Sequence, residues 1–394
     1  LSTYGAERLV STVAKEKALV FGLLSKSETL NRDYSSFRTH FRFFVVSLQI
    51  KHQKTDMTQT KKLIDKLTIL FTSLLIVGCT DDFKRPDTSN IDIDIKIRPF
   101  YKDMFKPYDD INLHISSLNN TYNGFFADLC KHELRIGAPS DSLFPTTFKQ
   151  FLSYKENAEV IATCDSVWET LSDIDKNITD GMKCMKYYFP NITTPEILTH
   201  FSGFNSKVIV DSTYISFCIE HYLGNNCRYY SWLEMPQYAR TTKSKEYIVP
   251  DLIKAWIYAN MPEQSEKEDI LTALIYQGKV IYATKSCLPN TPLQTIMGYN
   301  DQQMNWCEKA EAEMWGFMIE EKLLYNTNPL DKNKLINDAP YTSYFGQTSP
   351  GRAALWCGFN IVKNYMRLHP EITMQKLFEI ADAQQILIGS QYQP

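Results

Sequence analysis

The sequence predicts an α+β protein that is mainly α-helical, with a helical N-terminal lobe and a small sheet packed by helices. Apolar residues recur at helical spacing over much of residues 113–189 and 248–381. Residues 196–219, in contrast, hold short runs of β-branched and aromatic residues separated by Gly and Ser. The composition, 44% hydrophobic and 13% aromatic with only 15 Gly in 394 residues, excludes a disordered or collagen-like chain.

Charge divides the chain into unlike parts. The formal net charge is -3, yet residues 1–56 carry nine Lys or Arg against five Asp or Glu. Residues 57–78 add a net +2, so residues 79–394 carry -9. A protein that coats nucleic acid needs a basic excess, so we expect no nucleic-acid partner for this acidic body.

Residues 57–78 have the features of a secretory signal peptide. Two adjacent lysines precede residues 67–77, where only Thr and Ser are polar. Eleven residues make about 16 Å of helix, too short to cross a hydrocarbon core of about 30 Å. The ending Leu-Ile-Val-Gly-Cys at 75–79 resembles the bacterial lipobox, whose cysteine is acylated after cleavage. The segment therefore predicts a membrane anchor at Cys79; the alternative is an apolar helix that ends in Cys.

The parts on either side of this segment have different expected roles. Residues 1–56 are interpreted as an upstream extension, disordered or absent from the mature protein, because a signal peptide normally begins a chain. The alternative is a cytoplasmic arm. Residues 79–91 are mostly polar and predict a tether between lipid and body. We expect a helical lobe over residues 92–190 and an α+β domain over residues 191–394.

In the first lobe, residues 91–97 alternate Ile with charged residues, which predicts a half-buried strand. Apolar residues at helical spacing then predict helices over residues 113–136, 146–154 and 165–189, the last ended by Pro190.

In the second domain, three short segments predict two or three neighbouring strands; they lie at residues 196–200, 207–211 and 214–219. Helices are predicted over residues 248–259, 265–282, 301–325, 350–368 and 373–381. Asn300 or Asp301 is the expected N-cap of the third of these helices.

Eight cysteines remain besides Cys79. None forms a CxxC pair, which argues against a zinc ribbon or a thioredoxin-type site. Cys307 and Cys357 lie within apolar helical patterns and are expected in the core. In an exported protein a bridge between Cys218 and Cys227 is geometrically conceivable.

No catalytic motif is complete. His132-Glu133 is the nearest text to HExxH, but Ile136 stands where the second metal ligand is required, so an ordinary surface His and Glu are favoured. The sequence also lacks GxSxG, GxGxxG and the phosphate-binding GxxxxGK pattern. We therefore predict no catalytic residue, no metal site and no cofactor.

Two other groups of residues invite a functional reading. Glu308 and Glu311 share a helix face and could act as paired carboxylates, although a solvated acidic face is favoured. Ser349 is expected to cap an apolar helix at whose start Gly351 and Arg352 lie. Free backbone N–H groups and Arg352 could hold an anion or a partner there; the alternative is a cap whose Arg pairs with an internal acid.

From about residue 92 to residue 390 the chain resembles GldB, the gliding-motility lipoprotein family of Bacteroidetes. The resemblance is carried by the segments 187–190, 221–224, 247–251, 274–279, 297–299, 320–325 and 349–352, together with Trp315, Gly358 and Tyr365. The lipobox agrees with it, since that family is lipid-anchored. The family's C-terminal part is more distantly similar to gluzincin-type zinc peptidases, and the corresponding segment here, residues 250–256, contains no His. The resemblance thus implies a degenerate peptidase scaffold that has lost its metal.

These observations favour a non-catalytic envelope lipoprotein that supports gliding motility or type IX secretion by binding another envelope protein. The outer or inner membrane is the expected location, on the periplasmic face first and the cell surface as an alternative. A second hypothesis is a hydrolase that uses His221 or His132 with Glu308 and Glu311. A third is a carrier of a small apolar ligand in the aromatic-rich helical lobe.

Overall fold

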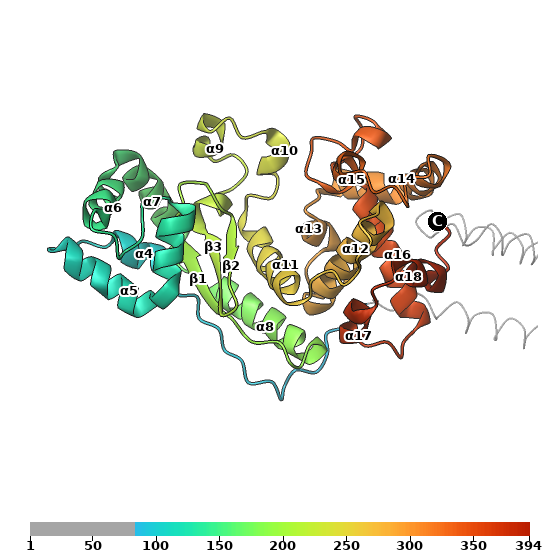
Figure 1. Cartoon of the computed structure of the whole chain (residues 1–394), viewed down its shortest axis with the longest axis horizontal. Helices are drawn as coiled ribbons and strands as arrows, with labels where there is room; N and C mark the ends of the chain where they lie inside the picture. The colour runs from blue at the N-terminus through green and yellow to red at the C-terminus, as the bar shows by residue number, and fades with distance from the viewer. Residues whose placement is uncertain (1–82) are drawn as a thin grey trace, which may run out of the picture. The chain divides into compact units, whose positions relative to one another are not determined.

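The computed structural model describes residues 83–394, which belong to one compact unit. The predicted extension, the signal peptide and Cys79 lie outside the described residues. The described part is mainly helical with one small mixed sheet, which confirms the predicted fold class (Figure 1). Among the helices of this part, none is both long and apolar enough to cross a membrane.

The N-terminal elements are helical. They are α4 (Phe100–Phe105), α5 (Ile111–Asp128), the π-helical turn η1 (Leu129–Glu133), α6 (Phe144–Ser153), α7 (Lys155–Val167) and α8 (Ser172–Tyr188). Asp110 caps α5 by accepting hydrogen bonds from the first free N–H groups of the helix. The predicted helices correspond to α5 with η1, α6 and α8, whereas α7 was not predicted.

The strand predicted at residues 91–97 is wrong, although its alternating burial is correct. Ile95 and Ile97 are buried, whereas the charged residues of the segment, Asp92, Asp94 and Lys96, are exposed. The backbone N–H groups of these two residues bond to side chains of α8, namely Thr179 Oγ1 at 3.0 Å and Asp175 Oδ1 at 3.0 Å. The segment is therefore extended, but helix side chains take the place of a neighbouring strand.

The sheet follows α8 and has three strands, the higher of the two numbers that the sequence allows. They are β1 (Glu196–His200), β2 (Val208–Val210) and β3 (Tyr214–Cys218), in the order β1-β3-β2. The central strand β3 pairs parallel to β1 and antiparallel to β2. All five residues of β3 are buried, because elements cover both of its faces. The chain then enters the 3₁₀ helix η2 (Ile219–Tyr222) at the carboxyl end of β3.

Helices make up most of the rest of the described chain. They are α9 (Arg228–Trp232), α10 (Gln237–Arg240), η3 (Lys245–Tyr247), α11 (Ile248–Asn260), α12 (Ile270–Cys287), α13 (Leu293–Met297), α14 (Asp301–Glu320), α15 (Pro329–Ile336), η4 (Ser343–Phe345), α16 (Ala354–Leu368), α17 (Met374–Glu379) and α18 (Ala383–Ser390). The five predicted helices correspond to α11, α12, α14, α16 and α17. Asn300 is the N-cap of α14 and accepts from Gln303 N at 2.9 Å, as one of the two predicted caps.

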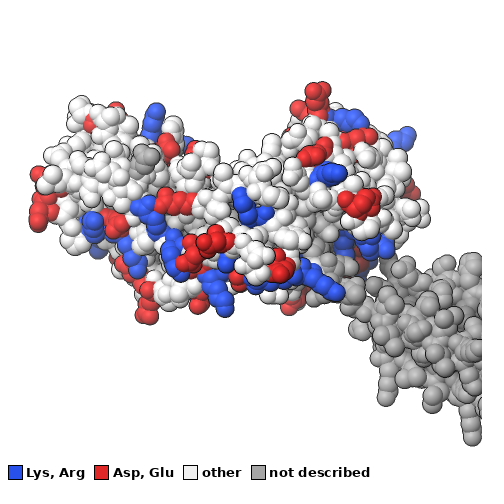
Figure 2. All heavy atoms as spheres, turned by 90° about the horizontal axis from the view of Figure 1, so that it is seen from below, with Lys and Arg blue, Asp and Glu red and all other residues white. Residues whose placement is uncertain are grey.

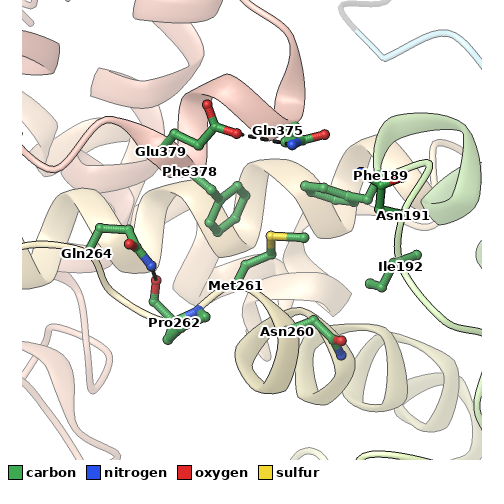
Figure 3. Close-up of a pocket in the computed structure, with 10 residues that line it drawn as sticks. All are labelled: Phe189, Asn191, Ile192, Asn260, Met261, Pro262, Gln264, Gln375, Phe378 and Glu379. Atoms are coloured by element: carbon green, nitrogen blue, oxygen red, sulfur yellow. Dashed lines mark hydrogen bonds between the residues drawn. The ribbon is translucent and has the colours of Figure 1, made fainter.

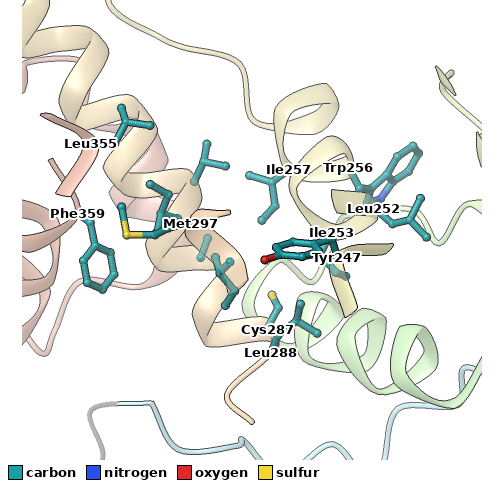
Figure 4. Packing of buried hydrophobic residues seen from close by; sticks show 14 of the residues in the cluster. Tyr247, Leu252, Ile253, Trp256, Ile257, Cys287, Leu288, Met297, Leu355 and Phe359 are labelled. Atoms are coloured by element: carbon teal, nitrogen blue, oxygen red, sulfur yellow. The ribbon is translucent and has the colours of Figure 1, made fainter. Parts of the chain in front are cut away.

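The larger core is formed by the sheet, α8 and the helices from α11 onward. Trp256 of α11 is buried there and donates its indole N–H to Thr193 O at 3.0 Å. Figure 4 shows apolar side chains of α11 meeting those of α12 and its neighbours. The closest helix packing joins α12 and α16, where a Cβ on Gly278 would lie 2.3 Å from the carbonyl oxygen of Gly358. Glycine is thus required at this crossing for steric reasons.

A smaller, aromatic core joins α4, α5 and α6 to β1 and β3. Phe144 and Phe148 stack at 5.3 Å between ring centroids, and Phe126 meets both edge-on. All three rings are at most 1% exposed. These aromatic residues pack against one another, so the rings that suggested a ligand carrier form a core of their own. The proposed division into lobes at residue 190 stays a prediction, and α8 contributes to the larger core.

Candidate functional site

A buried ion-pair network lies where α11 meets the sheet and η2. The carboxylate of Asp251 accepts a hydrogen bond from the Tyr222 hydroxyl at 3.0 Å and pairs with Lys207 Nζ at 2.6 Å. Lys254 Nζ, one helical turn along α11, lies 3.9 Å from the same carboxylate. We call Lys207, Lys243 and Lys254 the lysine cluster, because electrostatic interactions link Lys207 to both of the others.

Local structure explains how these side chains come together. Helix α11 is apolar apart from a few positions, and Asp251 and Lys254 stand three residues apart on one of its faces. Lys207 directly precedes β2, which packs against α11. The side chains of Lys207, Asp251 and Lys254 are 29%, 18% and 19% exposed, so solvent reaches them only in part.

In the lysine cluster the effects that lower the lysine pKa values outweigh those of the nearby acids, which are Asp251 for both lysines discussed below, Glu220 for Lys243 and Asp338 for Lys254. Burial lowers the pKa of Lys254 to about 8; Asp251 opposes this shift, while Arg352 and Lys207 add to it. Burial and then the charge of Lys207 lower the pKa of Lys243 to about 8 as well. A depressed lysine pKa means that the folded protein holds the charged form at a cost in free energy.

For Asp251, the carboxylate of the network, neighbouring charges outweigh the effect of burial on the pKa. Burial alone would raise the pKa of Asp251, but the charges of Lys207 and Lys254 and the hydrogen bonds from Lys207 and Tyr222 hold that pKa below its ordinary value. Asp251 is therefore ionised at neutral pH and serves as the counter-ion of the network.

Two further polar residues of η2 lie fully inside the molecule next to the lysine cluster. Glu220 is 0% exposed, and its Oε1 accepts from Ser202 N at 2.8 Å and from Phe204 N at 3.1 Å. His221 Nδ1 contacts Lys243 Nζ, and burial followed by the charge of Lys243 lowers the pKa of His221 to about 3. Because a lysine can only donate, the neutral imidazole carries its proton on Nε2. That Nε2 and Glu220 Oε2 are buried without a hydrogen-bond partner among the described residues.

The predicted cap at Ser349 is wrong, because α16 begins at Ala354. Ser349 is buried and donates to Gly346 O at 2.6 Å while accepting from Thr342 N at 3.0 Å. Thr342 Oγ1 instead accepts from Ala353 N at 2.9 Å, just before the helix. Ser349 thus closes the loop in front of α16.

Gly351 and Arg352 follow in a tight turn. A Cβ on Gly351 would lie 2.2 Å from Ala339 O, so this glycine is required by packing. Arg352 has φ 60°, pairs through Nε with Asp338 at 2.8 Å and donates from Nη2 to Met297 O at 3.0 Å. The paired acid is exposed rather than internal. Anion or partner binding by Ser349, Gly351 and Arg352 stays a prediction.

The residues of the hydrolase hypothesis have separate surroundings. His132 and Glu308 are exposed, on η1 and α14 respectively. Glu311 is half-buried and accepts from Trp356 Nε1 at 2.9 Å and from Tyr392 Oη at 2.7 Å, so it is a structural acceptor rather than part of a solvated face. Across residues 83–394, no group of three or more His, Cys, Asp or Glu side chains could hold a metal ion.

The cysteine predictions are partly confirmed. Cys307 and Cys357 are 0% exposed and lie in the larger core. Cys218 and Cys227 are both free thiols, so the conceivable bridge between them is absent from this part of the chain.

Two cavities are each lined in part by α17 and share Gln375 as a lining residue. The first, about 340 Å³, has apolar walls from Phe189, Met261 and Phe378 (Figure 3). The second, about 530 Å³, has tyrosine walls and includes Phe83, the first described residue. Neither is lined by the helices α4 to α7 that suggested a ligand carrier.

Sequence reasoning did not find the lysine cluster. One feature could have indicated it: Lys254 interrupts an otherwise apolar helix, and a charged residue on a buried face requires a partner. Lys207 and Lys243 carry no such feature, because they lie in short polar connections.

Comparison with known proteins gives one family. The family model described as "Gliding motility protein GldB" matches residues 81–394, which contain the whole region of the resemblance seen in the sequence. No curated protein and no solved structure matches the chain. The match covers most of the chain and all of its described fold, and the chain therefore belongs to the GldB family of gliding motility proteins.

Proposed function

We propose that the chain is a lipid-anchored lipoprotein of the cell envelope that supports gliding motility, or the related type IX secretion, by binding another envelope protein rather than by catalysis. Membership of the GldB family supports the link to gliding motility. The label of the family model, GldB_lipo, supports a lipoprotein, as does the lipobox-like ending at Cys79.

The observation that carries the non-catalytic part is the state of Asp251 on α11. This helix contains residues 250–256, the segment that the distant sequence resemblance places opposite the metal-binding helix of gluzincin-type peptidases. The carboxylate of Asp251 accepts a hydrogen bond from Tyr222 and pairs with Lys207 and Lys254. These contacts hold the pKa of Asp251 below its ordinary value. A carboxylate in this state is a poor general base at neutral pH, so the arrangement favours binding over hydrolysis.

The attachment of the tether supports an anchored body. Phe83 packs against Tyr282 at 5.2 Å and against Phe359 at 6.4 Å between ring centroids. Arg85 then pairs with Asp180 of α8 at 2.7 Å. Phe83 lies four positions after Cys79 in the sequence, and a fully extended chain over four positions spans about 14 Å. A lipid on Cys79 would therefore keep the cavity beside Phe83 close to the membrane surface.

Cell spreading tests this proposal in a gliding host. Deleting the gene is expected to abolish spreading, and a copy with Cys79→Ser is expected not to restore it, because the protein then loses its anchor. Cys227→Ser, which alters a free and partly exposed thiol, is the matched control and should restore spreading. Normal spreading after deletion, or full restoration by Cys79→Ser, would refute the proposal.

An envelope hydrolase with a non-standard site is the second candidate, and one observation favours it. Glu220 and His221 are buried next to each other in sequence, each with an atom that lacks a partner. Perturbed buried groups of this kind are common in active sites. Metal analysis of the purified chain distinguishes the two candidates, since stoichiometric zinc would overturn the non-catalytic proposal.

A further inference from the structure

We infer that the lysine cluster binds an oxyanion, a carboxylate or phosphate group presented by a ligand. This goes beyond the proposed function, because it names the chemistry of a site and holds whether the group belongs to a protein or to a small molecule.

The first argument is the balance of charge. Two ammonium groups, those of Lys207 and Lys254, share one contacting carboxylate, Asp251, and that carboxylate makes a close pair only with Lys207. Lys254 lies 3.9 Å from it, and Lys243 contacts a neutral imidazole. A buried cation without a close counter-ion costs free energy, and an oxyanion between Lys207 and Lys254 would supply the missing charge.

Other lysines show that this imbalance is local. Lys279 of α12 is buried too, yet it donates to Ile380 O at 2.7 Å. On the surface, Lys245 pairs with Asp173 at 3.1 Å. Figure 2 shows Lys and Arg side by side with Asp and Glu on the face that it draws. The lysine cluster therefore differs from these sites in lacking acceptors at hydrogen-bond distance for Lys254.

The second argument is a poorly partnered donor beside the lysine cluster. His221 is 5% exposed, its Nδ1 is taken by Lys243, and its protonated Nε2 has no acceptor within full hydrogen-bond geometry in the described structure, where the backbone of Phe204 is the acceptor that acts on the ring. Buried donors are almost always satisfied in folded proteins, so a poorly satisfied one next to excess positive charge indicates a missing acceptor.

The third argument is access. Lys207 and Lys254 are each partly exposed, and Arg352, whose charge acts on Lys254, is 23% exposed. An oxyanion could therefore reach the ammonium groups from solvent and contact more than one of them. Charge-assisted hydrogen bonds of this kind are about twice as strong as neutral ones.

Thermal unfolding of the purified full-length chain tests the inference. The midpoint is measured at pH 7 and constant ionic strength while chloride is replaced by inorganic phosphate or by succinate. A ligand that binds only the folded state raises the midpoint in a saturable way. We expect saturation with at least one of the two anions, and a response to only one would identify the phosphate or the carboxylate as the preferred group.

Variants assign the effect to the lysine cluster. Lys254→Met is expected to weaken the apparent affinity about tenfold, the loss of one charge-assisted bond. Lys254→Arg keeps the charge and should bind within a few-fold of the unaltered chain, even if the Met variant folds poorly. Lys267→Met, which alters an exposed pair with Asp382, is the control and should leave the affinity unchanged.

Two results would overturn the inference. One is the absence of a saturable response to both anions. The other is an equal response in Lys254→Met and the unaltered chain. Either result leaves the role of Cys79 in spreading untouched, so failure of this inference is distinguishable from failure of the proposed function.

Discussion

The α12–α16 crossing and the lysine cluster are two buried regions built on opposite principles. At the crossing, the backbones of Gly278 and Gly358 approach so closely that neither residue has room for a Cβ. At the lysine cluster, burial lowers the pKa of two lysines to about 8, and Glu220 Oε2 has no hydrogen-bond partner among residues 83–394. The first region maximises packing, whereas the second keeps charges that lower stability. Such a cost is typical of sites retained for function.

Gly358→Val tests most directly whether the α12–α16 crossing depends on close packing. Its Cβ would lie 2.2 Å from Leu274 O on α12, and backbone cannot move aside as a side chain can. We expect a loss of about 3–5 kcal/mol in the free energy of unfolding, measured by denaturant titration. A loss below about 1 kcal/mol would show that the crossing is not closely packed.

Asp251→Asn tests whether the lysine cluster depends on its one counter-ion. Removing the carboxylate leaves Lys207 and Lys254 buried without it, and we expect a loss of about 3 kcal/mol at pH 7. The folded pKa of Asp251 is lowered, so its contribution is present above pH 3.8 and is lost as the pH falls through the folded value. The difference between variant and unaltered chain should therefore shrink in acid; a difference that does not depend on pH would contradict this role.

Lys254→Met should raise the free energy of unfolding, whereas Asp251→Asn should lower it. Removing a lysine whose pKa is lowered to about 8 relieves an unfavourable charge, so we expect a gain of about 1–3 kcal/mol at pH 7. Between pH 8 and 10.5 the unfolded chain binds more protons at this lysine than the folded one, so the stability of the unaltered chain rises with pH. The gain should accordingly disappear by about pH 10. A loss of stability at pH 7 would refute the view that the lysine cluster is held at a cost.

Gly316→Ala should have the smallest effect on stability. It is a control for the claim that Gly358 is required for steric reasons. Gly316 is exposed within α14 and its added Cβ would meet nothing within 4 Å. We expect a gain of about 0.5–1 kcal/mol from helix propensity alone. Destabilisation at this position would mean that the cost at Gly358 cannot be assigned to close packing.

The elements that were predicted correctly are those whose pattern is local. The strand over residues 196–200 and the cap at Asn300 depend on residues a few positions apart. The errors come from tertiary contacts: residues 91–97 bond to α8 side chains, and Ser349 bonds to Thr342 across a loop.

The lysine cluster could not be predicted for the same reason. Lys207, Lys243 and Asp251 belong to three separate segments that meet only when α11 packs against the sheet. Only the Asp251 and Lys254 pair lies within one helix. Their spacing alone predicts an ordinary ion pair on a helix face. The excess of charge becomes visible only with the fold.

We propose that the oxyanion site inferred at the lysine cluster serves binding in gliding and is kept at the expense of stability. Spreading of gliding cells whose only copy carries Lys254→Met, at the same abundance as the unaltered protein, tests it most directly. The account predicts clearly reduced spreading despite a protein that is at least as stable. Spreading equal to that of the unaltered strain would contradict it.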